Sequence, residues 1–368
     1  MGLFDIFSRR RIRYNVWSLV NRRVFTFGNE LGQPVQIISD IDKTYLDTAF
    51  ESLGGLAKIA LETADEKKSI EGARDFLRHL KWGSVKEETT ISNLVPLHFV
   101  SSSPPQLRSV LEEKISMDGL KWSSDSFKDQ IYNIKKGKLN LLKHQVSYKM
   151  ASILSLCSQF TGLEKLLLIG DNAETDPYIY FLVKFLLSGD LSQSEVISLL
   201  TFLNVPEKIG KQIFEKCGEI PQCSNVDILI RKIPGKSASV PKEIRECLNY
   251  FDDYTQASVY AHGLGYLSLE SVFETIISYH NFYGADLLFM IDGFSDYLKK
   301  HDYEVSSDLL AQIESVRKRL DKFSPGSSLD RKSEDWYKHS GVFENNLEVD
   351  ELYSIFERWV VEEKEKLS

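Results

Sequence analysis

The sequence predicts an α/β fold, in which helices cover both faces of a parallel sheet. Short apolar runs that suit buried strands alternate with stretches whose apolar residues recur at the helical period. The runs are closed by acidic, glycine or serine-proline turns. Strands that alternate with helices in this order are typical of parallel sheets built from βαβ units.

The elements can be placed in chain order. The predicted strands are Val35–Ile38, Pro96–Val100, a third in the loop-rich stretch around Trp122 and Phe127, Leu166–Ile169 and Val226–Ile230. The predicted helices start near Phe50, run from about Ile70 to Trp82, from Leu107 to Ile115 and from Lys143 to Phe160, and lie between Tyr178 and Cys217 and from Leu347 to Leu367. In the second helix Ala73, Phe76, Leu77 and Leu80 share one face, which suits packing on a sheet.

This pattern divides the chain into three segments. Residues 1–33 are expected to be an N-terminal arm, 34–235 the α/β domain and 236–368 a mainly helical C-terminal region. A linker is expected over Pro234–Ser239, and the polar stretch Ser324–Ser340 is expected to be a loop. The aromatic residues after the linker are interpreted as a helical core or a layer packed on the domain, in preference to a ligand site.

Composition excludes several classes. The chain has 368 residues, 42% of them hydrophobic and 27% charged, which is ordinary for a globular protein. A net charge of -8 argues against broad nucleic-acid binding, which needs a basic face. Four cysteines without CxxC spacing favour reduced thiols, and no run suits a membrane span or a secretory signal. We therefore expect a cytoplasmic protein.

Three strand ends carry residues suited to phosphoryl transfer. Asp40 and Asp42 follow the first strand, Ser101 follows the second, and Gly170-Asp171 opens a turn that reaches Asp176. Ligands of open α/β sheets bind beyond the carboxyl ends of the strands, so these groups should meet there. Carboxylates suit nucleophilic attack, proton transfer and a hard cation, and a hydroxyl suits a phosphate oxygen.

Lys149, on the helix before the fourth strand, adds a positive charge that could neutralise a transferring phosphoryl group. Each piece alone has an ordinary explanation: an acidic turn, a serine-rich loop or a solvated lysine. Their order and their common position at strand ends favour a site.

These motifs resemble the haloacid dehalogenase (HAD) superfamily, whose first motif, Asp-x-Asp-x-Thr, matches Asp40, Asp42 and Thr44. With Phe99–Leu107 and Ile169–Tyr180 they resemble one branch, the catalytic domains of the actin-patch-associated phosphatidate phosphatases and their bacterial relatives. The resemblance covers about Val35 to Ile233. It implies a HAD-like Rossmannoid sheet, and the short span from Thr44 to Pro96 leaves room for only a small cap.

The resemblance also implies roles. Asp40 would be the nucleophile that becomes phosphorylated, and Asp42 the acid and base. Mg²⁺ would be held by Asp40, the Asp42 backbone carbonyl and Asp171, with Asp176 as a ligand or as a residue that orients the ligands. Ser101 and Lys149 would bind the phosphoryl group. Ser103 and Asn172 rank lower.

The expected activity is therefore Mg²⁺-dependent hydrolysis of a phosphomonoester, with a lipid such as phosphatidate as one candidate substrate. The alternatives are a protein or small-metabolite phosphatase and a catalytically silent binding module with the same fold. Lys43 departs from the better-known members, which carry a third acid there, and a cation beside the mouth of the site could alter the substrate preference. The familiar lipid phosphatases also have other flanking regions, so the resemblance implies the mechanism more directly than the substrate.

Three further features have simpler interpretations. In the N-terminal arm, Leu3 to Phe7 precede four arginines, and local docking on the domain is favoured over contact with an anionic membrane surface. The Lys135–Lys138 run is interpreted as a solvated turn rather than a steering patch. His98 lies inside a strand, so a core role is preferred, and no histidines have metal-ligand spacing.

Overall fold

The computed structural model describes residues 16–25, 30–47, 63–82, 94–128, 141–173, 175–203, 205–235, 241, 244–245, 247–301, 303, 305–323, 354 and 358. Several sequence predictions lie outside these residues: the Leu3–Arg13 part of the N-terminal arm, the helix near Phe50 with any cap it forms, the Lys135–Lys138 run, the Ser324–Ser340 loop and, apart from Ser354 and Arg358, the final helix.

The described elements, in chain order, are η1 (Val16–Leu19), β1 (Val20–Val24), η2 (Glu30–Gly32), β2 (Val35–Ser39), α2 (Ala73–Trp82), β3 (Leu97–Ser101), η4 (Pro105–Leu107), α3 (Arg108–Met117), β4 (Ser124–Lys128), α5 (Leu141–Cys157), β5 (Lys165–Asp171), α6 (Asp176–Ser188), α7 (Gln193–Phe202), α8 (Glu207–Cys217), β6 (Val226–Arg231), β7 (Asn249–Phe251), α10 (Tyr254–Gly263), α11 (Leu269–Tyr283), α12 (Leu287–Lys300) and α13 (Ser307–Phe323).

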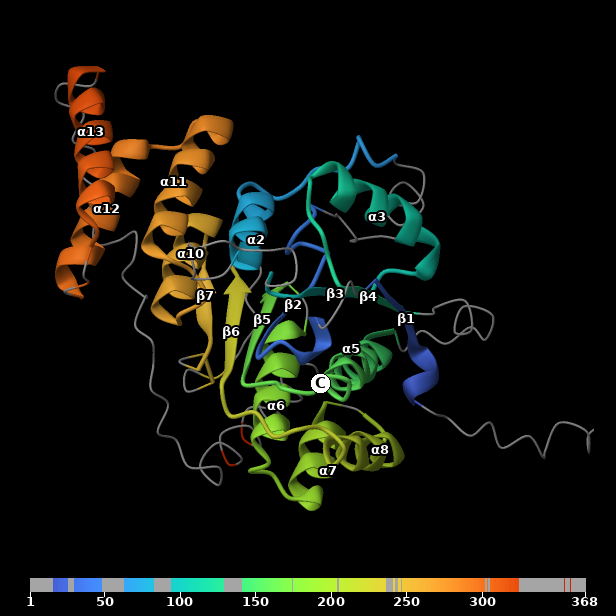
Figure 1. Cartoon of the computed structure of the whole chain (residues 1–368). Helices are drawn as coiled ribbons and strands as arrows, with labels where there is room; N and C mark the ends of the chain where they lie inside the picture. The colour runs from blue at the N-terminus through green and yellow to red at the C-terminus, as the bar shows by residue number, and fades with distance from the viewer. Residues whose placement is uncertain are drawn as a thin grey trace, which may run out of the picture.

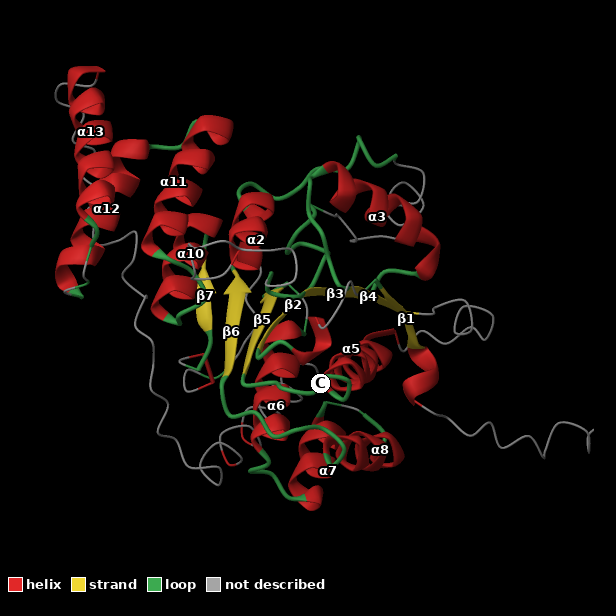
Figure 2. Cartoon of the chain, viewed as in Figure 1, coloured by secondary structure: helices red, strands yellow, loops and turns green. Residues whose placement is uncertain are grey.

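The strands form one seven-stranded sheet in the order β1-β4-β3-β2-β5-β6-β7. Every neighbouring pair is parallel except β1 and β4, which are antiparallel. Figure 2 shows the strands as one twisted sheet with helices on both sides. The predicted α/β class, a mostly parallel sheet flanked by helices, is confirmed.

Strand order reverses in the middle of the sheet. From β2 the chain adds β3 and then β4 on one side, and β5 then returns to the other side of β2 and is followed outward by β6 and β7. The carboxyl ends of β2 and β5 therefore lie side by side where the two halves diverge. Such a switch point opens a crevice in which α/β proteins bind ligands.

Alternate strand residues supply two apolar layers. Ile38 and Leu168 pack in the cluster with α5, α6, α7 and α8, whereas Ile37, Leu167 and Ile169 pack in the cluster with α2, α3 and α10. Successive side chains of a strand point to opposite faces, so β2 and β5 are covered on both sides. This explains why apolar residues occupy consecutive positions in both strands, at Ile37 and Ile38 of β2 and Leu166–Ile169 of β5.

A third apolar cluster joins α11, α12 and α13 to Val259 of α10. In Figure 1 these helices extend outward at the β7 side of the sheet, away from β1. The helices of the C-terminal region are thus attached to the sheet through α10. Among the described helices, none combines the length and the apolar composition that crossing a membrane requires.

Two strands were not predicted. β1 lies in the segment expected to be an arm, and β7 lies beyond the expected linker, so the sheet extends past residues 34 and 235. β1 has only two apolar residues, and β7 has three residues in an aromatic segment that suggests helix. Both are edge strands that form because the sheet offers them a pairing partner.

Candidate functional site

The first carboxylate of the site is placed by the end of β2. Asp40 follows Ser39 directly, and its backbone N–H donates to the carbonyl of Ile169 on β5 at 2.8 Å. Its side chain is 1% exposed. The apolar run of β2 therefore carries a carboxylate to the switch point and buries it there.

The next two carboxylates come from the turn between β5 and α6. Asp171 is the last residue of β5 and Asp176 is the first of α6, and both are fully buried. A Cβ at Gly170 would lie 2.5 Å from Asp176 Oδ2 and 2.7 Å from Tyr180 Cε2. Only glycine permits this approach, so the Gly170-Asp171 pair brings Asp176 back against the strand.

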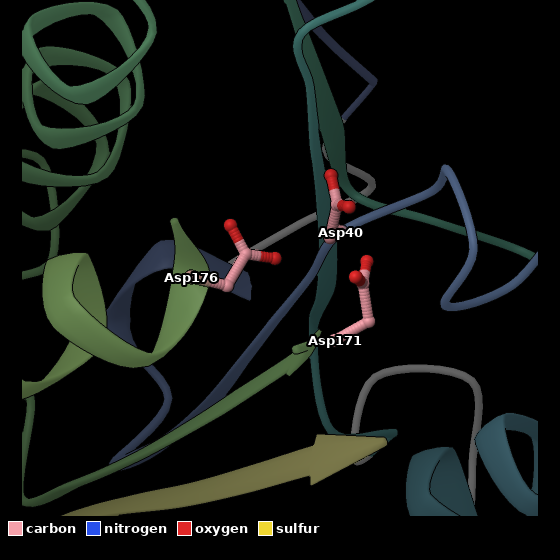
Figure 3. A group of neighbouring side chains, drawn as sticks. All are labelled: Asp40, Asp171 and Asp176. Carbon is pink, nitrogen blue, oxygen red and sulfur yellow. The ribbon is translucent and has the colours of Figure 1, made fainter. Parts of the chain in front are cut away.

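Asp40, Asp171 and Asp176 converge, as Figure 3 shows. Each offers one carboxylate oxygen, and these oxygens lie within 4.8 Å of one another. Lys149, which lies on α5 and is 1% exposed, extends to this group of carboxylates. Its Nζ lies 3.3 Å from Asp40 Oδ1 and 2.5 Å from Asp176 Oδ1.

The charges of this cluster suit a divalent cation. Three buried carboxylates each offer an oxygen to the same point, and the ammonium of Lys149 lies beside two of them. Oxygen ligands are also those that hard cations prefer. Asp40, Asp171 and Asp176 therefore fit a divalent metal.

The fourth carboxylate, Asp42, is oriented separately. Ser101 Oγ and Ser103 Oγ donate to Asp42 Oδ2 at 2.8 Å and 2.9 Å. The backbone N–H of Ser103 donates in turn to Ser101 Oγ at 2.9 Å. The turn after β3 thus holds Asp42 with two hydroxyls. Ser103, ranked below Ser101 from the sequence, makes an equivalent contact.

Three more residues support the strand ends. Thr44 Oγ1 donates to Asp171 Oδ2 at 3.4 Å, which links the first and third motifs. Tyr180 of α6 donates its hydroxyl to the Ile169 carbonyl at 3.1 Å. Burial, followed by the Asp176 charge, raises the pKa of Tyr180 well above its usual range, so this hydroxyl keeps its proton.

Two other predicted residues have structural roles. Asn172 accepts a hydrogen bond from the Ile233 N–H through Oδ1 at 2.7 Å, which fastens the turn after β5 to the end of β6. His98 lies between Ser124 and Gln36 in the sheet, as its position in a strand predicted. Sequence reasoning missed Arg231 and Tyr254, whose contacts with the Asp42 loop are described below.

Comparison with known proteins identifies the same segment. A family model described as "Phosphatidate phosphatase APP1, catalytic domain" matches residues 35–189. This match supports that family for the segment, which contains every residue of the acidic cluster, Asp42, Ser101 and Lys149.

A curated relative is an uncharacterized protein of Schizosaccharomyces pombe, with 29% identity over 148 residues. The aligned part is 40% of this chain and 22% of that protein, so the chain spans only about a fifth of the relative's length. No solved structure is significantly similar to the chain.

Proposed function

We propose that the protein is a Mg²⁺-dependent phosphatase of the HAD type that hydrolyses a phosphomonoester through an aspartyl phosphate on Asp40, with phosphatidate as the leading substrate. The convergence of three buried carboxylates and Lys149 at the switch point carries this proposal. The matching family model supports a phosphatase and names phosphatidate. The strand order around β2 and β5 supports a Rossmannoid sheet.

The residues divide the chemistry between them. An Asp40 oxygen attacks phosphorus while the bond to the ester oxygen breaks, and Asp42 gives that oxygen its proton. Water then attacks the phosphorus of the aspartyl phosphate, and Asp42 takes the proton of the water. Phosphate leaves and the Asp40 carboxylate is regenerated. The hydroxyls of Ser101 and Ser103 hold Asp42 for both transfers.

The cation and Lys149 would both offset negative charge at the site. A divalent metal, when bound by Asp40, the Asp42 backbone carbonyl, Asp171 and Asp176, supplies Lewis-acid stabilisation of phosphoryl oxygens. Lys149 contacts both Asp40 and Asp176, so it orients the nucleophile and offsets charge that develops on the phosphoryl group. Lys149 remains the proposed phosphoryl-binding residue, whereas Ser101, predicted to share this role, donates its one hydroxyl proton to Asp42.

The test is phosphate release by the purified full chain with Mg²⁺ from phosphatidate, a phosphopeptide and a sugar phosphate. We expect release from phosphatidate, and a fall of about a thousandfold or more in Asp40→Asn, because an amide is not a nucleophile. Asp42→Asn should slow turnover at an unchanged Mg²⁺ requirement, and Asp171→Asn should raise that requirement. The control is Asp227→Asn, which changes a carboxylate at the amino end of β6, away from the site, and should leave turnover unchanged.

Each part of the proposal can fail separately. Undiminished turnover in Asp40→Asn would contradict the mechanism. Release from the peptide or the sugar phosphate alone would exclude the lipid substrate. An inactive parent protein whose thermal stability is unaffected by Mg²⁺ with beryllium fluoride would leave the silent binding module as the explanation.

A further inference from the structure

The loop that carries Asp42 is held by two side chains from far along the chain. Arg231 Nη1 donates to the carbonyl of Lys43 at 2.9 Å, across 188 positions. The Tyr254 hydroxyl donates to the next carbonyl, that of Thr44, across 210 positions. Two consecutive peptide groups directly after Asp42 are therefore anchored by residues that lie outside the matched segment 35–189.

The loop has a conformation that needs such support. Lys43 has φ = 57°, in the left-handed region that costs a residue with a Cβ about 1–2 kcal/mol. Inside the loop, the Lys43 N–H donates to the Leu46 carbonyl, and the N–H groups of Tyr45 and Leu46 both donate to the Ile41 carbonyl. These bonds close the turn on itself, and Arg231 and Tyr254 connect it to the sheet and to α10.

Tyr254 is itself fixed. It is the first residue of α10, where Asp253 Oδ1 caps the helix by accepting from the N–H groups of Thr255 and Gln256. Its ring is 1% exposed and packs against Phe76 and Phe251, with centroids 5.3 Å and 5.1 Å apart. Burial raises the pKa of its hydroxyl, so the group stays a donor. The cap and the ring contacts therefore fix the position of the Tyr254 hydroxyl.

Arg231 is fixed by the sheet. It ends β6 and lies in register with Asp171 on β5 and Phe251 on β7. Its own carbonyl accepts from the Asn172 N–H at 3.0 Å. Arg231, whose guanidinium anchors Lys43, thus lies at the same carboxyl ends of the strands as the acidic cluster.

We propose that Tyr254 and Arg231 are positioning residues for the phosphatase reaction: by anchoring the carbonyls of Thr44 and Lys43 they set where Asp42 stands relative to Asp40. The catalytic unit then extends through β6 and β7 to α10, beyond residues 35–189, which the family model matches. This proposal rests on the proposed function for its kinetic consequence, but the anchoring itself is measurable without it.

The sharpest variant is Tyr254→Phe, which removes one oxygen and keeps the ring contacts. We expect kcat to fall about 10- to 100-fold with KM within about twofold, because a displacement of about 1 Å in a catalytic group costs rates of this order. Arg231→Met should show the same split. The matched control is Tyr260→Phe, which removes a hydroxyl from a buried tyrosine of the same helix and cluster and should leave kcat unchanged.

Hydrogen exchange of the intact protein supplies a readout that does not depend on activity. We expect the amides of residues 43–46 to exchange faster in Tyr254→Phe and in Arg231→Met than in the parent and in Tyr260→Phe. An inactive parent would refute the proposed function, and exchange alone would then decide whether these residues anchor the loop.

Three results would overturn the proposal. The first is a kcat within twofold of the parent in both Tyr254→Phe and Arg231→Met. The second is an equal loss of kcat in Tyr260→Phe, which would indicate general destabilisation. The third is hydrogen exchange of residues 43–46 that none of the variants changes.

Discussion

The buried imidazole of His98 is expected to make the stability of this protein depend on pH. The ring of His98 contacts Gln36 Oε1 through Nε2 at 2.9 Å and Ser124 Oγ through Nδ1 at 2.8 Å. Gln36 uses its amide nitrogen to donate to two backbone carbonyls, so its oxygen faces the ring and Nε2 carries the proton. Burial, followed by the charges of Lys81 and Arg22, lowers the pKa of His98 to about 3.

Because the pKa of histidine in the unfolded chain is about 6.5, His98 takes up a proton in the unfolded chain first as the pH falls. The stability that comes from a neutral His98 is therefore complete above about pH 6.5 and is lost progressively toward pH 3. We expect this residue to lower the free energy of unfolding by about 2 kcal/mol between pH 7 and pH 5.

Urea unfolding at several pH values checks this expectation. The loss between pH 7 and pH 5 should shrink in His98→Gln and persist in His301→Gln, which replaces an exposed histidine. Parallel stability curves for the parent and His98→Gln would contradict the assignment.

At the scale of elements, β4 shows how a polar strand can be buried. All five of its residues are buried, yet four of them are polar or charged: Ser124, Asp125, Ser126 and Lys128. Arg108, the first residue of α3, donates through Nε to Asp125 Oδ1 at 2.8 Å and through Nη1 to Asn21 Oδ1 of β1 at 2.7 Å. One guanidinium thus joins α3, β4 and the edge strand.

We expect Arg108→Met to lower the free energy of unfolding by about 3–5 kcal/mol, because it leaves the Asp125 carboxylate buried without its ion-pair partner. Amides of β1 should also exchange faster. The control is Arg23→Ala, which breaks an exposed pair with Glu112 and should cost less than about 1 kcal/mol. Equal effects of the two variants would show that Arg108 does not join these elements.

At the scale of the whole molecule, the C-terminal region completes the core. Phe251, Tyr254 and Tyr260 lie in the same apolar cluster as Phe76 of α2 and Leu229 of β6. α11 also contacts α2, where His79 Nδ1 and Thr275 Oγ1 are 2.8 Å apart. Removing the region would therefore uncover the part of one sheet face that α10 covers.

A chain that ends at residue 235 should not unfold cooperatively, since it loses β7, α10 and the apolar area that they bury. A chain that ends at residue 323 retains every described apolar cluster and is the control. Circular dichroism during urea titration measures both. A cooperative transition in the shorter chain would show that residues 1–235 fold independently of the C-terminal region.

The sequence by itself determined the central elements. β2, β3, β5 and β6 coincide with predicted strands, because their apolar runs and closing turns are local features. The candidate residues at the ends of β2, β3 and β5 could be named for the same reason, and Lys149 from its helix. Their catalytic roles remain predictions.

The tertiary structure decided what these residues contact. Asp176 joins Asp40 and Asp171, while Asp42 turns to Ser101 and Ser103, an assignment that depends on how separate strands and turns meet. β1 and β7 carry too little apolar signal and form through pairing with neighbours, whereas β4 lies in the stretch around Trp122 and Phe127 where a third strand was predicted. Arg231 and Tyr254 reach the loop from about two hundred positions away. Local periodicity specifies an element, but only the register between distant elements specifies which side chains meet.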